Sequence, residues 1–162
     1  DNIVFVETNT PPYGYYTKAD KQKDKGLELE ASVNFGKVQL NANYTNLDGK
    51  IETKMSTKDT AFFNLYRRPR QTINLNVGID LCNNWNMNLG VQSISKRYEA
   101  VYASAPIEMP AYYAWNLYSS FTINKGIKVF VDLKNITDEK YSEVRGYNSR
   151  RFNFMTGVNL KF

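Results

Sequence analysis

The chain has 162 residues, 42% of them hydrophobic, which is enough for one domain, and no shift in composition marks a second one. It contains no run of about 18 apolar residues, which excludes a transmembrane helix, and no histidine, which removes the usual general base and metal ligand of an enzyme. The net charge of +5 comes from scattered basic residues interspersed with acids, which argues against a nucleic-acid-binding patch, and the single Cys82 can form no internal disulfide.

The first residues predict a strand followed by a long loop. The strand is expected over residues 3–7 and the polar loop over residues 8–25. The chain begins Asp1-Asn2-Ile3, without a basic or apolar leader. It is therefore expected to be one segment of a longer protein.

A hairpin is predicted next. From Gly26, apolar residues alternate with polar ones as far as Phe35, and after the Gly36-Lys37 turn the alternation resumes from Val38 to Thr45. A period of two is typical of a strand with one apolar face. About ten residues also match a tilted strand that crosses a membrane. The pattern therefore predicts a membrane-crossing hairpin.

The same alternation recurs to the end of the chain. It predicts two more hairpins and a last strand: residues 72–81 with 85–91, residues 113–123 with 127–133, and residues 151–162. The connections between hairpins, residues 48–70, 96–110 and 138–150, are long and polar, whereas the turns within hairpins are short. We expect roughly eight antiparallel strands, with both termini on the short-turn side. This all-β, up-and-down pattern is typical of an outer-membrane β-barrel over residues 1–162.

Alternation alone does not say whether the apolar side faces lipid or an internal core, so a lipocalin-like barrel or a sandwich is the alternative. The polar side favours lipid, because it is rich in asparagine, which ordinary strands avoid. These residues are Asn34, Asn41, Asn43, Asn74, Asn76, Asn86, Asn88, Asn116, Asn153 and Asn159. Small amides suit a hydrated lumen, and charges stay off the apolar side, where one at the bilayer midplane costs about 2 to 4 kcal/mol.

Aromatic residues cluster toward the expected strand ends, where rings lie at headgroup depth. They are Tyr44, Tyr66, Trp85, Tyr112, Tyr113, Trp115, Phe152 and Phe162. Ordinary core packing is the alternative. Tyr118 and Phe130 fall on the polar side instead, so we expect them to pack against something in the lumen.

The sequence indicates no catalytic site. It has no phosphate-binding loop, zinc spacing or nucleophile elbow. The acid pairs Glu28 with Glu30 and Asp138 with Glu139 are explained by lumen positions and by a solvated turn. We therefore expect no enzyme, no metal and no cofactor.

Ligand contact is expected in the long loops, which combine arginine and tyrosine. The richest stretches are Arg97-Tyr98-Glu99-Ala100-Val101-Tyr102 and Tyr141-Ser142-Glu143-Val144-Arg145-Gly146-Tyr147. The candidates are Arg97, Tyr98, Tyr102, Tyr141, Arg145 and Tyr147, and the alternative is a rim without ligand contact. The basic stretch Arg67-Arg68-Pro69-Arg70 is a candidate contact for anionic lipopolysaccharide.

Four stretches together resemble the TonB-dependent outer-membrane receptors. They are Asp132-Leu133-Lys134-Asn135-Ile136-Thr137-Asp138-Glu139-Lys140-Tyr141; Gly146-Tyr147-Asn148-Ser149-Arg150-Arg151 with a terminal Phe162; Lys25-Gly26-Leu27-Glu28-Leu29-Glu30-Ala31; and Arg67-Arg68-Pro69-Arg70. They occur in the family's order and span nearly the whole chain.

The resemblance implies a 22-stranded barrel closed by an amino-terminal plug, with uptake driven by the inner-membrane TonB complex. This chain would supply the last eight or so strands, without the plug. The Gly146-Tyr147-Asn148 run is most similar to cobalamin receptors, and ferric-siderophore receptors are the alternative. The resemblance also implies that Phe162 belongs to the signal read by the barrel assembly machinery. A surface lipoprotein is a further implied partner.

Two other classes of protein compete with a receptor. A stand-alone eight-stranded barrel with a structural or adhesive role has an interior filled by side chains, so its charged lumen residues would have to pair there. An outer-membrane lipid hydrolase or acyltransferase is disfavoured, because no histidine is present to activate a serine.

Overall fold

The computed structural model describes residues 3–7, 10–18, 21–55, 58–62, 67–99 and 107–162. Every regular element in these ranges is a β-strand. No helix among the described residues is long and apolar enough to cross a membrane.

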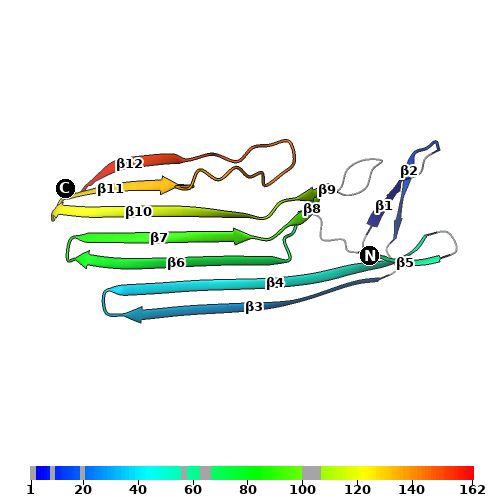
Figure 1. Cartoon of the computed structure of the whole chain (residues 1–162), viewed down its shortest axis with the longest axis horizontal. Coiled ribbons are helices and arrows are strands. Elements are labelled where there is room, and N and C mark those ends of the chain that lie inside the picture. Colours follow the sequence, from blue (N-terminus) through cyan, green and yellow to red (C-terminus); the bar gives the residue numbers. More distant parts are fainter. Residues whose placement is uncertain (1–2, 8–9, 19–20, 56–57, 63–66, 100–106) are drawn as a thin grey trace.

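One antiparallel sheet makes up most of the chain (Figure 1). Its strands are β3 (Lys21–Phe35), β4 (Val38–Met55), β5 (Lys58–Phe62), β6 (Gln71–Cys82), β7 (Trp85–Ile94), β10 (Tyr112–Asn124), β11 (Ile127–Lys134) and β12 (Asn153–Leu160). The order is β12-β11-β10-β7-β6-β4-β3, and β5 pairs with β4. Apart from β5, strands that follow one another in this sheet are neighbours, which confirms the up-and-down arrangement. β3 and β12 are the two edge strands of this order and do not pair with each other, so the sheet is open.

The three predicted hairpins are confirmed, with the short turns at one end of the sheet (Figure 1). Phe35 pairs with Val38 around a turn in which Gly36 has φ +58°, a conformation that glycine adopts without steric cost. The turn between β10 and β11 is stabilised by the Gly126 amide, which donates to Asn124 Oδ1 at 2.9 Å. These local signals fix the register, so each strand keeps its apolar residues on one face.

Two short hairpins lie within segments that we expected to contain loops. One pairs β1 (Ile3–Glu7) with β2 (Gly14–Lys18), and the other pairs β8 (Arg97–Glu99) with β9 (Ile107–Met109). The predicted strand over residues 3–7 therefore exists, but it lies outside the large sheet, whose eighth strand is β5. Because β1 lies at the long-loop end (Figure 1), the expectation of both termini on the short-turn side is wrong for the amino-terminal strand.

The chain has almost no internal core. The buried hydrophobic residues of the described ranges are Ile94, Met109, Tyr112 and Ala114. The accessible surface is 11811 Å², whereas a compact soluble protein of this mass exposes about 8,300 Å². The apolar side of the sheet carries much of the excess: Leu27, Leu29, Val33, Phe35, Ile73, Ile79, Leu89, Phe121, Ile123, Phe154, Val158 and Leu160 are exposed. The sheet is a single layer whose apolar face is exposed, so the alternative of a sandwich with its apolar residues turned inward is wrong.

Two strands extend well beyond the membrane-crossing length. β3 has 15 residues and β4 has 18, whereas about 9 to 11 residues cross a bilayer. In Figure 1 the two strands continue past β6 and β7 toward β5 at the long-loop end. On this face of β3 the apolar residues begin at Leu27, and the residues that precede it at steps of two, Lys25 and Lys23, are charged. The extension therefore places a charged part of the sheet above its apolar band.

Candidate functional site

The polar face of the sheet carries rows of amide side chains that run across the strands. One row joins Ser32 to Asn41, Asn76 and Gly90 through successive cross-strand pairs. Ser32 Oγ donates to Asn41 Oδ1 at 2.8 Å. A Cβ at Gly90 would lie 2.7 Å from Asn76 Oδ1, so the glycine leaves the space that this amide occupies. The predicted asparagine face therefore forms ordered cross-strand rows.

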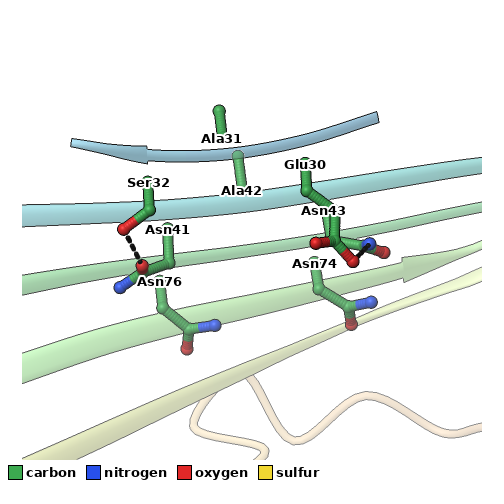
Figure 2. A pocket seen from close by; sticks show the side chains of 8 residues that line it. All are labelled: Glu30, Ala31, Ser32, Asn41, Ala42, Asn43, Asn74 and Asn76. Carbon is green, nitrogen blue, oxygen red and sulfur yellow. Dashed lines mark hydrogen bonds between the residues drawn. The ribbon is translucent and has the colours of Figure 1, made fainter. Parts of the chain in front are cut away.

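A second row lies beside the first and contains the acid Glu30, which pairs with Asn43, itself paired with Asn74. Asn43 Nδ2 donates to Glu30 Oε1 at 3.3 Å. The two rows line a shallow hollow of about 420 Å³ over β3, β4 and β6, where the labelled amides and Glu30 lie together (Figure 2). Each amide both donates and accepts, so this wall can bind water or a polar protein surface. Its chemistry suits a hydrated lumen.

The two aromatic residues expected in the lumen contact each other and a glycine. Tyr118 and Phe130 stack with ring centroids 6.1 Å apart. The Phe130 ring lies over Gly157 of β12, where an added Cβ would be 2.7 Å from two ring carbons. The ring thus covers backbone that has no side chain of its own. This packing within the sheet accounts for two aromatics on a polar face.

At the long-loop end, the buried Arg97 joins two loops. Its side chain, on β8, is 4% exposed. One guanidinium nitrogen donates to the carbonyl oxygens of Ser142 and Glu143 in the β11–β12 loop. The guanidinium also lies 5.5 Å from the ring centroid of Tyr112, in cation–π range. Arg97 is therefore engaged within the protein.

Glu99 lies two residues further along β8, on the same buried side. Its carboxylate accepts from Arg67 Nε at 2.8 Å and from the backbone amide of Arg145 at 2.9 Å. The amide of Arg145 and the Arg67 guanidinium hold the pKa of this carboxyl below its usual range, against the opposing effect of burial. Sequence reasoning missed this role, although Arg97 and Glu99 at a spacing of two were a usable signal.

A small aromatic cluster lies beneath this junction. Tyr112 is 5% exposed and packs with Ile94 and Ala114, and its ring stacks on Tyr141 with centroids 4.0 Å apart. The expectation that Tyr112 lies in a headgroup belt is therefore wrong. Tyr112 lies on the lumen face of β10, whereas its neighbour Tyr113 lies on the opposite face and is 59% exposed. Two adjacent tyrosines on a strand point to opposite faces, and only Tyr113 faces outward.

The motif that carries the family resemblance folds the β11–β12 loop. Asn135 is 3% exposed and has φ +50°. Its Nδ2 donates to the carbonyls of Glu139 at 2.9 Å and Arg150 at 3.3 Å, and its Oδ1 accepts from the Glu139 amide at 2.9 Å. Asp138 accepts from Arg151 Nε at 2.7 Å and from the Phe152 amide at 3.0 Å. These residues shape the loop from within.

The structure divides the six candidate ligand residues. Arg97 and Tyr141 take part in the internal contacts already described, and the Tyr98 hydroxyl donates to Glu108 Oε2 at 2.9 Å. Arg145 is exposed, and Tyr147 is 75% exposed. Tyr102 lies outside the described residues. The loop therefore presents Arg145 and Tyr147, while Arg97 and Glu99 hold it in place.

The fold agrees with the comparison to known proteins. The family model described as TonB dependent receptor-like, beta-barrel matches residues 1–136, and the chain belongs to this family. These receptors are outer-membrane β-barrel proteins that transport nutrients, which places the chain in the outer membrane. No curated protein matches the chain.

Solved receptors show the same fold at low sequence identity. The ferric-catecholate import receptor Fiu from E. coli K12 is 16% identical with a TM-score of 0.77, over 98% of this chain and 23% of that one. The pyoverdine receptor FpvA from Pseudomonas aeruginosa PAO1 is 18% identical with a TM-score of 0.78, over 99% and 25%. The copper transporter OprC is 16% identical with a TM-score of 0.72, over 100% and 27%. The chain spans about a quarter of the length of these proteins.

Proposed function

We propose that this chain forms part of the barrel wall of a TonB-dependent receptor that imports a scarce nutrient, and that the plug and the remaining strands belong to other parts of the same protein. The observation that carries this proposal is the open, single-layer sheet with exposed apolar residues on one face and amide rows on the other. In a wide barrel the first face contacts lipid and the second meets a hydrated lumen.

The open sheet also supports the receptor over a stand-alone eight-stranded barrel, whose closure requires its edge strands to pair. If residues 1–162 expressed alone gave a heat-modifiable, detergent-stable barrel, the stand-alone alternative would be favoured. The receptor proposal expects such a product only when the rest of the barrel is present.

Two ligand classes are the leading candidates. Cobalamin is suggested by the resemblance of Gly146-Tyr147-Asn148 to cobalamin receptors, and ferric siderophores by the similarity to the ferric-catecholate receptor Fiu and the pyoverdine receptor FpvA. Uptake of radiolabelled cobalamin and of iron-loaded siderophores should be measured in cells that carry the complete receptor, with and without an active TonB complex. Uptake of one ligand that disappears without TonB supports the proposal, and uptake that is independent of TonB contradicts it.

Within the loops, we expect Arg145 and Tyr147 to contact the ligand, with Tyr98 and Tyr102 contributing from the β7–β10 connection. Truncating a tyrosine that packs on a ligand weakens binding by roughly tenfold or more. The comparison is Tyr147→Ala against Tyr113→Ala, a control whose tyrosine is also exposed but on the lipid-facing side. Equal affinity of both variants for the transported ligand would remove Tyr147 from the site.

The other expected partners follow from the same position in the barrel. We expect the plug to pack on the amide rows, because groups that both donate and accept pair with polar protein surfaces. We also expect Phe162, which is fully exposed at the end of the last strand, to act in assembly. Phe162→Ala should lower the folded amount of receptor in the outer membrane without changing the affinity of the folded fraction for its ligand.

A further inference from the structure

The turn that presents Arg145 and Tyr147 has little to hold it by itself. Val144 and Tyr147 form an isolated antiparallel bridge, in which the Tyr147 amide donates to the Val144 carbonyl at 3.1 Å. Gly146, between them, has φ +84°. One backbone hydrogen bond adds little net stability, because the open chain makes the same bonds to water. The position of residues 144–147 therefore depends on contacts outside the turn.

The outside contact of the turn is the buried carboxylate of Glu99 on β8. The Arg145 amide donates to Glu99 Oε2 at 2.9 Å, so an exposed residue is anchored through its backbone to a side chain that lies below the surface. Because the anchor is the amide, this bond leaves the Arg145 guanidinium available for other contacts. Glu99 thus fixes the backbone from which Arg145 is presented.

The same carboxylate fixes the segment that enters β6. Glu99 Oε1 accepts from Arg67 Nε at 2.8 Å, and the Arg67 amide donates to the Tyr98 carbonyl at 2.8 Å. Arg67 has φ +61°, a conformation that a residue with a Cβ rarely adopts unless surrounding contacts impose it. Both the backbone and the side chain of Arg67 are therefore held by β8, shortly before β6 begins at Gln71.

The two partners of Glu99 depend on each other, because they bind the two oxygens of one carboxylate. The pKa of this carboxyl is held below its usual range, first by the Arg145 amide and also by Arg67, although burial opposes them, so the group is charged at neutral pH. If either partner leaves, a buried charge is left incompletely paired, which costs more than the bond itself is worth. Opening of the turn is therefore coupled to release of Arg67.

A contrasting carboxylate lies on β9, the strand paired with β8. Glu108 accepts from Lys96 Nζ and from the Tyr98 hydroxyl, each at 2.9 Å, so both of its partners belong to the same connection between β7 and β10. The partners of Glu99 lie 32 and 46 positions away, in two other connections. A carboxylate bonded within one hairpin stabilises that hairpin alone, whereas Glu99 joins three segments of the chain.

We infer that Glu99 is a positioning residue of the ligand-contacting surface, which holds the turn at residues 144–147 and the entry of β6 at one buried carboxylate so that the two open together. The inference rests on the proposed contact of Arg145 and Tyr147 with the ligand. The coupling of the two segments, in contrast, is a property of the receptor without ligand, so it is tested separately.

Amide hydrogen exchange on the complete receptor without ligand tests the coupling. Glu99→Gln keeps the size of the side chain and removes its charge. It should accelerate exchange at Arg145 and Tyr147 by roughly tenfold or more, because a hydrogen bond to a buried charge is stronger than one to a neutral group. The Ile136 amide, which donates to a backbone carbonyl of β10 at 2.9 Å at the base of the same loop, should be unchanged. The matched control, Glu108→Gln, should leave all these amides unchanged.

Arg67→Gln is the sharper variant, because among the described contacts Arg67 reaches the turn only through Glu99. It should accelerate exchange at Arg145 several-fold, and in the Glu99→Gln background it should have no further effect. Unchanged exchange at Arg145 in Arg67→Gln overturns the inference, and so does an equal acceleration in Glu108→Gln. Heat-modifiable migration shows whether each variant is folded. Arg67, whose side chain is 62% exposed, decides the matter if Glu99→Gln does not fold.

Ligand kinetics separate a positioning residue from a contact residue. The probes are cyanocobalamin and an iron-loaded catecholate siderophore, and the one that binds the wild-type receptor is measured. Glu99→Gln should lower the association rate with little change in dissociation, since fewer molecules have an ordered turn at any moment. Tyr147→Ala, which removes a contact, should mainly accelerate dissociation. Faster dissociation from Glu99→Gln with unchanged association overturns the positioning role. Binding of neither probe contradicts the proposed ligand classes, and the exchange experiment still decides the coupling.

Discussion

Replacing Asn135 by alanine should open the β11–β12 loop without unfolding the barrel. The change removes three hydrogen bonds from a side chain that is 3% exposed. At about 1 kcal/mol for each bond, the loss is roughly 3 kcal/mol. Alanine also tolerates the φ of +50° less well than asparagine, which adds about 1 kcal/mol. The expected cost to the closed loop is therefore about 4 kcal/mol.

Amide hydrogen exchange on the complete receptor measures this cost. The reporter is the Ser149 amide, which donates to the Tyr141 carbonyl at 3.1 Å, a bond in which Asn135 takes no part. A cost of about 4 kcal/mol corresponds to an acceleration between roughly a hundredfold and a thousandfold. Asn135→Gly keeps the backbone freedom, so its acceleration should be several-fold smaller. Ligand affinity should fall with both, because the same loop carries Arg145 and Tyr147.

The control is Asn124→Ala, which removes one exposed hydrogen bond at the other end of β10. It should leave exchange at Ser149 unchanged. If Asn135→Ala accelerates Ser149 exchange by less than about threefold, the motif does not hold the loop, and the argument that it shapes the ligand-contacting surface fails.

Three other predictions test the packing, the electrostatics and the orientation. Gly157→Ala should displace the Phe130 ring and lower the stability of the folded receptor by about 1 to 3 kcal/mol, measured by thermal unfolding. Adding Phe130→Leu should restore the stability, and a double variant that is no more stable than Gly157→Ala would contradict the packing. The pKa of Asp138 is lowered mainly by Arg151, so the ion pair stabilises the loop at neutral pH, and this contribution is lost as the pH falls through that lowered pKa. Opening of the loop, measured by amide hydrogen exchange, should therefore increase in acid, and Asp138→Asn should abolish this increase. Cys82, which is exposed, ends β6 beside the short β6–β7 turn. In a receptor with no other cysteine, a membrane-impermeant maleimide should react with it only after the outer membrane is permeabilised, and labelling of intact cells would reverse the assigned orientation.

The hairpins of the sheet were predictable from the sequence because strand alternation is a local property, although β3 and β4 run further than the alternation indicated. The alternation from Gly26 to Thr45 appears as β3 and β4 with Phe35 paired to Val38. The asparagine face is confirmed as cross-strand rows, such as Asn41 with Asn76. A period of two requires only that neighbouring side chains point to opposite faces, so composition and spacing suffice.

The loop region was predicted less well, because its structure depends on contacts between segments far apart in the sequence. β5, β8 and β9 lie inside stretches that composition marks as polar connections. Tyr112 and Tyr141 meet although 29 positions separate them, and Arg97 reaches the carbonyls of Ser142 and Glu143. An arginine in a loop has the same sequence pattern whether it binds a ligand or a backbone carbonyl.

The sequence by itself determined that this chain builds an antiparallel wall with one apolar and one amide-bearing face, since alternation is set residue by residue. Only the tertiary structure decided that the apolar face stays exposed on an open sheet and that Arg97 and Glu99 tie the loops together. The physical reason is that these features depend on register and on long-range pairing, which fix which side chains meet.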